Sequence, residues 1–316
     1  MFTDSPLISL KPPTRSATWR MAVVCCLAAG LLSACGGGSS SPGGGAPVDP
    51  SPPDPTAPPT SNPSTSTTIV PGVYTATWKD KELTIVITRD SATSATGKMY
   101  ALHFNSLTDP VAGLSLDPDI FAGALTGIGT KIANVNTLTY FPYNTTTLRT
   151  GSAELSLPYA GRLSLVTRLA SIQTQPIPWS LEPSVDLKMD TPALPSSLAG
   201  RWTGRMTYGF GSDNNFSLNF TSDPTTNDPY NMATIGSKYF QQDCQITSGK
   251  TTPAAGGVNL FNVSFSTPNA TQCFIKNQAL TGVAYISSSP VAGKTQRLQW
   301  LATTADGRGV SFRADR

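Results

Sequence analysis

Few residues of this 316-residue chain could carry acid–base or metal chemistry. The chain has a single histidine, His103, in the stretch KMYALHFN. On a strand His103 would share a face with Met99 and Ala101, and no neighbouring cluster completes a catalytic triad or a metal site. We therefore expect a solvent-facing strand residue at this position, and we predict no catalytic residue, no metal and no cofactor.

Carboxylates are the other candidates for chemistry. Asp117 and Asp119 stand in LDPDIF, and Asp223 and Asp228 stand in TSDPTTNDPYN. Paired acids can hydrolyse glycosides when a set distance separates them across a cleft, but Asp-Pro-Asp is more simply a turn before a strand. An acid-pair hydrolase is thus the weakest hypothesis, and the chain is predicted not to be an enzyme.

The N-terminal segment has the layout of a secretory signal. Three positive residues precede an apolar run over residues 21–32. Two small residues and Cys35 follow this run. The run is shorter than the roughly 20 residues that a transmembrane helix needs. We expect residues 1–34 to be a signal peptide that is removed on export.

The four residues Leu32-Ser33-Ala34-Cys35 resemble the lipobox of bacterial lipoproteins, in which the signal is cut before a cysteine that carries diacylglycerol. The resemblance implies that Cys35 is the lipid-attachment residue, bearing palmitate-type chains, and the first residue of the mature protein. Gly36 follows, in place of the aspartate that retains such lipoproteins in the inner membrane. An outer-membrane address is therefore implied, with the periplasmic and cell-surface sides both open. The alternative is an ordinary signal peptide cut after Ala34 or later.

Residues 35–69 are predicted to be the lipidated cysteine and a disordered tether. The stretch GGGSSSPGGGAPVDPSPPDPTAPPTSNPSTSTT has almost no apolar side chains with which to offset the entropy of ordering. Glycine and serine make the first part a loose coil, and the prolines stiffen the second part. Such a tether would hold a folded body away from the membrane.

An internal echo indicates two folded domains after the tether. Gly72-Val73-Tyr74-Thr75-Ala76 recurs about 128 positions later as Gly200-Arg201-Trp202-Thr203-Gly204. Both copies read glycine, any residue, aromatic, threonine, small residue. We predict β domains over residues 70–183 and 198–316, joined by a proline-rich linker over residues 184–197.

The dominant period in both domains is two. The stretches ELTIVIT, NFSLNFTS and LFNVSFS alternate apolar side chains with Ser, Thr or Asn. Strands with one buried face are typical of antiparallel sheets, and Asp306-Gly307 predicts a hairpin turn. Each domain has room for about eight short strands, enough for a small antiparallel barrel or sandwich. The predicted fold class is therefore all-β, with two such domains.

Two further resemblances concern these domains. Trp78 and Trp202 lie near the starts of the two domains. Tryptophan after a glycine in an opening strand resembles lipocalin and avidin barrels, in which an aromatic residue closes one end. The second domain resembles the repeat of poorly characterised proteobacterial lipoproteins, which contains a cysteine strand, a Gly-x-Asn-x-Phe-x-Val strand and a second cysteine. Here these are Cys244, residues 257–263 and Cys273. No activity attaches to that resemblance.

Cys244 and Cys273 are the two cysteines that remain after the signal and the lipid-attachment residue are set aside. In an oxidising compartment an even pair predicts a disulfide, and closing a loop of about 30 residues would stabilise the fold by roughly 3–4 kcal/mol. A metal site or a redox pair is the alternative. Two distant cysteines without a nearby histidine are poor zinc ligands.

Charge and aromatic residues bear on partners. Without residues 1–34 the chain has 19 basic and 18 acidic residues, a net charge of +1, and no basic run. A nucleic-acid partner is therefore not expected. Tyr140, Phe141 and Tyr143 in TYFPYNTTT form a candidate binding patch on a proline-containing loop.

Two functional hypotheses of different classes follow. The first is a non-enzymatic envelope lipoprotein of the binding or adhesion type, with the membrane as partner through its lipid and an envelope or extracellular protein or glycan as target. The alternative is a carrier of a small apolar ligand in a calycin-like barrel. The space inside the barrel decides between them, because a carrier needs a lumen of about 300 Å³ or more.

Overall fold

The computed structural model describes residues 65–78, 81–104, 118–142, 147–159, 161–169, 177–184, 191–208, 211–222, 230–234, 246, 248–269, 273 and 275–316. Within these ranges the chain forms antiparallel strands and a single 3-10 turn, η1 (Pro195–Ser197), so the all-β prediction is confirmed. None of the described residues belongs to a helix that is long and apolar enough to cross a membrane.

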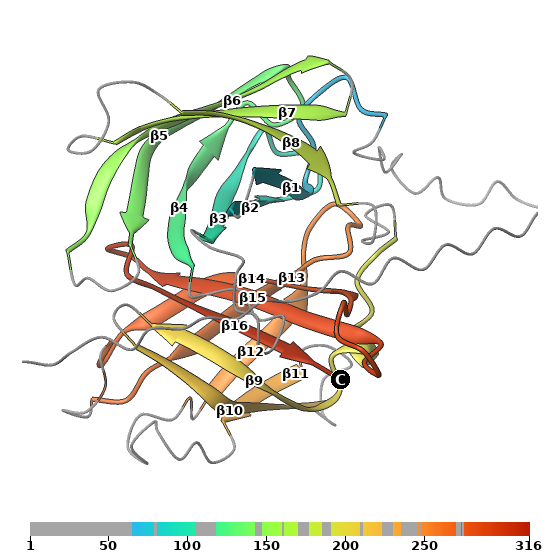
Figure 1. The fold of residues 1–316 in the computed structure, drawn as a ribbon, viewed down its shortest axis with the longest axis vertical. Helices are drawn as coiled ribbons and strands as arrows, with labels where there is room; N and C mark the ends of the chain where they lie inside the picture. The colour runs from blue at the N-terminus through green and yellow to red at the C-terminus, as the bar shows by residue number, and fades with distance from the viewer. Residues whose placement is uncertain are drawn as a thin grey trace, which may run out of the picture. The chain divides into compact units, whose positions relative to one another are not determined.

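The first eight strands close into a barrel, here called barrel 1 (Figure 1, blue to yellow-green). Each strand pairs with the next along the chain, and β8 pairs back onto β1 through Tyr74 and Thr75. The strands are β1 (Gly72–Trp78), β2 (Lys81–Arg89), β3 (Thr96–Phe104), β4 (Asp119–Thr126), β5 (Ile132–Phe141), β6 (Arg149–Tyr159), β7 (Arg162–Leu169) and β8 (Ile177–Pro183).

The next eight strands close into barrel 2 (Figure 1, yellow to red), in which β16 pairs with β9. The predicted Asp306-Gly307 turn joins β15 to β16, and the Gly307 amide donates to the Thr304 carbonyl at 3.0 Å. The strands are β9 (Gly200–Tyr208), β10 (Gly211–Ser222), β11 (Tyr230–Thr234), β12 (Ser248–Pro253), β13 (Phe261–Ser266), β14 (Ala279–Ser288), β15 (Gln296–Thr304) and β16 (Gly309–Asp315).

Both barrels have a packed apolar interior. In barrel 2 the rings of Phe265 and Trp300 meet edge to face with centroids 5.4 Å apart, and Phe216 and Phe312 do the same at 5.7 Å. In barrel 1 the interior is mainly aliphatic and includes the side chains of β2 that the period of two predicts: Leu83, Ile85 and Ile87. Alternation places these side chains inward, and burying them in a common core stabilises each barrel.

The outward face of β2 differs from the prediction. Thr84 and Thr88, expected on a solvated face, are only 2% and 6% exposed. The reason is a third apolar cluster, which takes side chains from β1–β5 of barrel 1 and also Val283 and Leu301 of barrel 2. The described residues of both barrels accordingly belong to one compact unit. The echo predicts two domains, each a barrel or a sandwich; the structure has two barrels, and they share a buried core.

The aromatic residues of the two echo copies, Tyr74 and Trp202, make equivalent hydrogen bonds in the two barrels. In barrel 1 the Tyr74 hydroxyl donates to the Val70 carbonyl at 2.9 Å, and in barrel 2 the Trp202 indole Nε1 donates to the Leu198 carbonyl at 2.8 Å. Each buried aromatic residue thus ties its opening strand to the backbone four residues earlier. The Arg316 guanidinium lies 3.9 Å from the Trp202 ring centroid and adds a cation–π contact.

The folded part begins before residue 70. Ile69, the last residue of the predicted tether, is fully buried in the interior of barrel 1, and its amide donates to the Thr130 carbonyl at 2.7 Å. Ser66 is also buried and accepts a hydrogen bond from the Gly161 amide at 3.1 Å. The apolar pair Ile69-Val70 therefore belongs to the barrel, because burying it outweighs the disordering effect of the neighbouring Ser and Thr residues.

Cys273 is buried and is a disulfide cysteine. Cys244, its predicted partner, lies outside the described residues, and so does Cys35. The pairing of Cys244 with Cys273 and the lipidation of Cys35 therefore stay predictions.

Candidate functional site

The first candidate site lies where β3 ends and β4 begins. In the antiparallel register of these strands His103 stands directly opposite Asp119. His103 alternates with Met99 and Ala101 toward the interior of barrel 1, and its side chain is only 17% exposed. The prediction of a solvent-facing histidine is therefore wrong: the barrel closes around that face of β3.

A buried carboxylate organises this end of the barrel. Asp119 is 5% exposed, and its Oδ2 accepts a hydrogen bond from the Tyr140 hydroxyl at 3.1 Å. The His103 Nδ1 lies 3.5 Å from the same oxygen. Together with the rings of Phe121 and Trp179, these residues are called the Asp119 cluster below.

Aromatic rings enclose the polar atoms of the cluster. Phe121 stacks on Tyr140 with centroids 4.5 Å apart, and Trp179 meets the imidazole of His103 edge-on at 5.4 Å. Burial, the charge of Asp119 and the hydrogen bond to it raise the pKa of Tyr140 well above its ordinary value. Tyr140 is thus a neutral hydrogen-bond donor at physiological pH.

The cluster offers one unused polar atom. The His103 Nε2 is buried, and it has no hydrogen-bond partner in the part of the chain that the structure describes. A carboxylate facing Nδ1 favours the tautomer with its proton there, which leaves Nε2 as an acceptor or base. The described residues bring no hydroxyl or thiol to Nε2, and they contain no group of three or more metal-ligating side chains.

Removing the carboxylate tests how tightly the cluster is coupled. Asp119→Ala is expected to lower the free energy of unfolding by about 2–3 kcal/mol, because the Tyr140 hydroxyl loses its charged acceptor. Tyr140→Phe keeps the stacking on Phe121 and is expected to cost about 1–2 kcal/mol. Urea denaturation of both single variants and the double variant would give a coupling of at least about 0.5 kcal/mol. Strict additivity would show that the hydrogen bond contributes nothing.

Two residues of the predicted aromatic patch do not lie together on a loop. Tyr140 and Phe141 lie on β5 rather than on a loop, and adjacent strand residues point to opposite faces. Tyr140 faces the Asp119 cluster, whereas Phe141 is 1% exposed within the core that the barrels share. Tyr143 lies outside the described residues, as do Asp117, Asp223 and Asp228.

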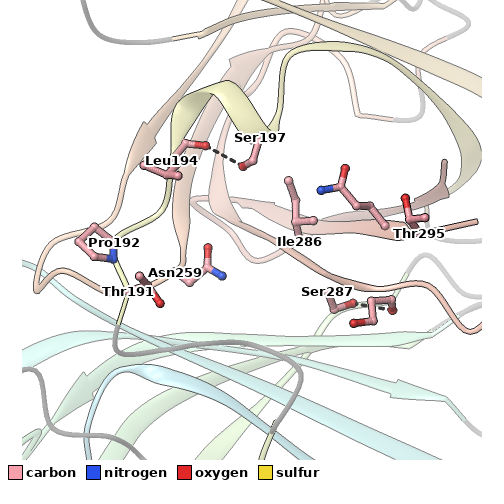
Figure 2. Close-up of a pocket in the computed structure, with 10 residues that line it drawn as sticks. Thr191, Pro192, Leu194, Ser197, Asn259, Ile286, Ser287 and Thr295 are labelled. Atoms are coloured by element: carbon pink, nitrogen blue, oxygen red, sulfur yellow. Dashed lines mark hydrogen bonds between the residues drawn. The ribbon is translucent and has the colours of Figure 1, made fainter.

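The second candidate site is a groove on barrel 2 with a cavity volume of about 390 Å³. Figure 2 shows Pro192, Leu194 and Asn259 on one side and Ile286 and Thr295 on the other, beneath the turn of η1. Its apolar part is Pro192, Leu194 and Ile286. Its other lining residues are all uncharged, with hydroxyl or amide side chains: Thr191, Ser197, Ser287, Ser288, Thr295, Asn259 and Gln296.

Arg316 connects the η1 side of this groove to Gln296 through hydrogen bonds. Its guanidinium donates to the carbonyls of Ser197 and Ala199, both at 2.8 Å, and to the Gln296 Oε1 at 3.0 Å. The last bond fixes which way the Gln296 amide points, so that its NH₂ group is turned away from Arg316. None of the described residues forms a hydrogen bond with that NH₂ group or with the Asn259 side-chain amide, so both are free to bind a ligand.

No known protein family matches this chain, and no curated protein does. Among solved structures, a protein of unknown function from the DUF3598 family of Nostoc punctiforme is similar at 8% identity and a TM-score of 0.26, covering 78% of this chain and 95% of its own. A candidate outer membrane protein of Bacteroides fragilis is similar at 10% identity and a TM-score of 0.22, covering 81% and 100%. Similarity this weak carries no argument about function.

Proposed function

We propose that this chain is an envelope lipoprotein, anchored to the outer membrane through Cys35, whose two barrels act as a non-enzymatic binding module. Cleavage before Cys35 would leave a lipidated first residue, and residues 36–64 would tether the barrels to the membrane. The target would be an envelope or extracellular protein or glycan.

The observation that supports a binding module over a carrier is the packing of the barrel interiors. In barrel 2 Trp202, Trp300, Phe216, Phe220 and Phe312 are each at most 2% exposed within a single apolar cluster. Leu198 and Ala193, from the segment before β9, belong to the same cluster. Rings packed against one another in this way occupy the space that an apolar ligand would need. Binding is therefore proposed at solvent-accessible sites outside the cores.

Native mass spectrometry of the full-length protein purified from membranes tests this choice. The binding-module proposal expects the mass of the mature chain plus its lipid alone. A small apolar molecule that co-purifies with the native protein, and is released only on unfolding, would instead establish the carrier.

The anchor has its own test. Cys35→Ala is expected to abolish metabolic labelling with palmitate and to move the protein from the membrane pellet to the soluble fraction. Each buried methylene contributes about 0.8 kcal/mol, so several acyl chains hold a protein on a membrane almost permanently. Cys26→Ala, within the predicted signal, is the matched control and should still be labelled. Persistent labelling and membrane association of Cys35→Ala would overturn the proposal.

A further inference from the structure

We infer that the groove between η1 and the β14–β15 hairpin is a binding site for a neutral, hydroxyl-rich ligand, that is, an uncharged saccharide. The inference rests on the proposed function, because it names the class of target that the binding module would take.

The absence of charge at this groove limits the class of ligand. None of the described residues that line it is charged, and the neighbouring Arg316 guanidinium already donates to Ser197, Ala199 and Gln296, so the lining itself offers no charged partner for a carboxylate or phosphate. Serine and threonine hydroxyls both donate and accept, and amides offer two donors and an acceptor. Sugar hydroxyls have the same dual character. A lining of hydroxyls and amides therefore matches a neutral saccharide.

Two free amides define the polar side of the site. Asn259 and Gln296 are half-buried and have free NH₂ groups, and Gln296 is held in place by the 3.0 Å hydrogen bond from Arg316. A donor fixed in the free protein loses little entropy when a ligand binds. Arg316 is thus a positioning residue for the site.

Three apolar side chains define the other side. Leu194 is 66% exposed and stands beside Pro192, while Ile286 is partly buried and packs against the core of barrel 2. Exposed leucine next to free amides suits a ligand with both a C–H face and hydroxyl groups. The volume of about 390 Å³ falls in the range of small-ligand sites.

An extended peptide is the less favoured occupant. Peptides commonly bind a β protein by pairing with a free strand edge. Here β14 and β15 are each paired on both sides within a closed barrel, so the groove presents no such edge.

Saturation-transfer NMR on the full-length chain tests the inference, with maltose and cellobiose as neutral probes and glucuronic acid as the charged comparison. We expect at least one neutral disaccharide to bind with a Kd tighter than about 1 mM, and glucuronic acid not to bind. Gln296→Leu and Asn259→Leu should each weaken binding about tenfold. Gln278→Leu, a half-buried glutamine outside the groove, is the matched control and should bind as the parent does.

Failure of both disaccharides to bind, or equal binding by Gln296→Leu and Gln278→Leu, would overturn the inference. Binding of a neutral Gly-Ser peptide in preference to both disaccharides would overturn it in favour of a peptide site. These results leave the binding-module proposal standing, since that proposal fails only if the protein carries a ligand in its interior or lacks its lipid. The two failures are therefore distinguishable.

Discussion

Replacing Trp202 by alanine is expected to lower the free energy of unfolding by about 3–5 kcal/mol. The indole is fully buried, its Nε1 donates to the Leu198 carbonyl, and Arg316 lies over its ring. Alanine would leave a cavity in the core of barrel 2 and an unpaired carbonyl, and it would remove the ring that the Arg316 guanidinium contacts. All three effects act in the same direction.

Two further variants separate these effects in urea denaturation followed by circular dichroism. Trp202→Phe keeps most of the ring but loses the donor, and we expect a cost of about 1–3 kcal/mol. Ile132→Ala, at a position that is 53% exposed on β5, should change stability by no more than about 0.5 kcal/mol. A Trp202→Ala protein as stable as Ile132→Ala would contradict the stabilising role of the buried Trp202 ring.

The second large effect is expected at alkaline pH. Burial raises the pKa of Tyr100 to about 12 and raises the pKa values of Tyr74 and Tyr285 further still. Above pH 10 the unfolded chain releases these protons, while the folded chain keeps them. The contribution of these tyrosines to the free energy of unfolding is therefore fully present below pH 10. It is lost as the pH rises toward 12, by about 1.4 kcal/mol per pH unit for each tyrosine.

Tyrosine variants assign that loss to particular groups. Tyr100→Phe should reduce the fall in stability between pH 10 and about pH 12 by about 1.4 kcal/mol per pH unit, whatever its effect at neutral pH. Tyr159→Phe, at a position that is 73% exposed, is the matched control for the loss of a tyrosine hydroxyl group. Urea denaturation midpoints of the parent and both variants, measured between pH 10 and about pH 12, test the assignment to Tyr100. An unchanged slope in Tyr100→Phe would contradict the assignment.

Much of the fold follows from local patterns in the sequence. Alternation in ELTIVIT and LFNVSFS specifies strands and their inward faces, and the Asp306-Gly307 turn specifies one hairpin. The echo of Tyr74 in Trp202 predicts a repeated opening strand. The patterns do not predict the burial of Thr84 and Thr88. A small polar side chain gives the same sequence pattern on a solvated face as in a core shared by two barrels.

The sites depend on register and on contacts between distant segments. His103 and Asp119 face each other only because β3 and β4 pair in one register across a long connection, and the sequence does not specify that register. The signal that could have found them is the position of both residues at strand ends. The groove joins residues 191–197 to residues 286–296, a proximity that only the closed barrel creates.

The most direct test of the lipoprotein proposal is mass spectrometry of the N-terminal peptide of the mature protein, isolated from membranes. The proposal predicts that this peptide begins at Cys35 and carries a diacylglycerol thioether on its sulfur. An unmodified N-terminus at Cys35 or later, in protein recovered from the soluble fraction, would contradict it and would leave an ordinary exported protein.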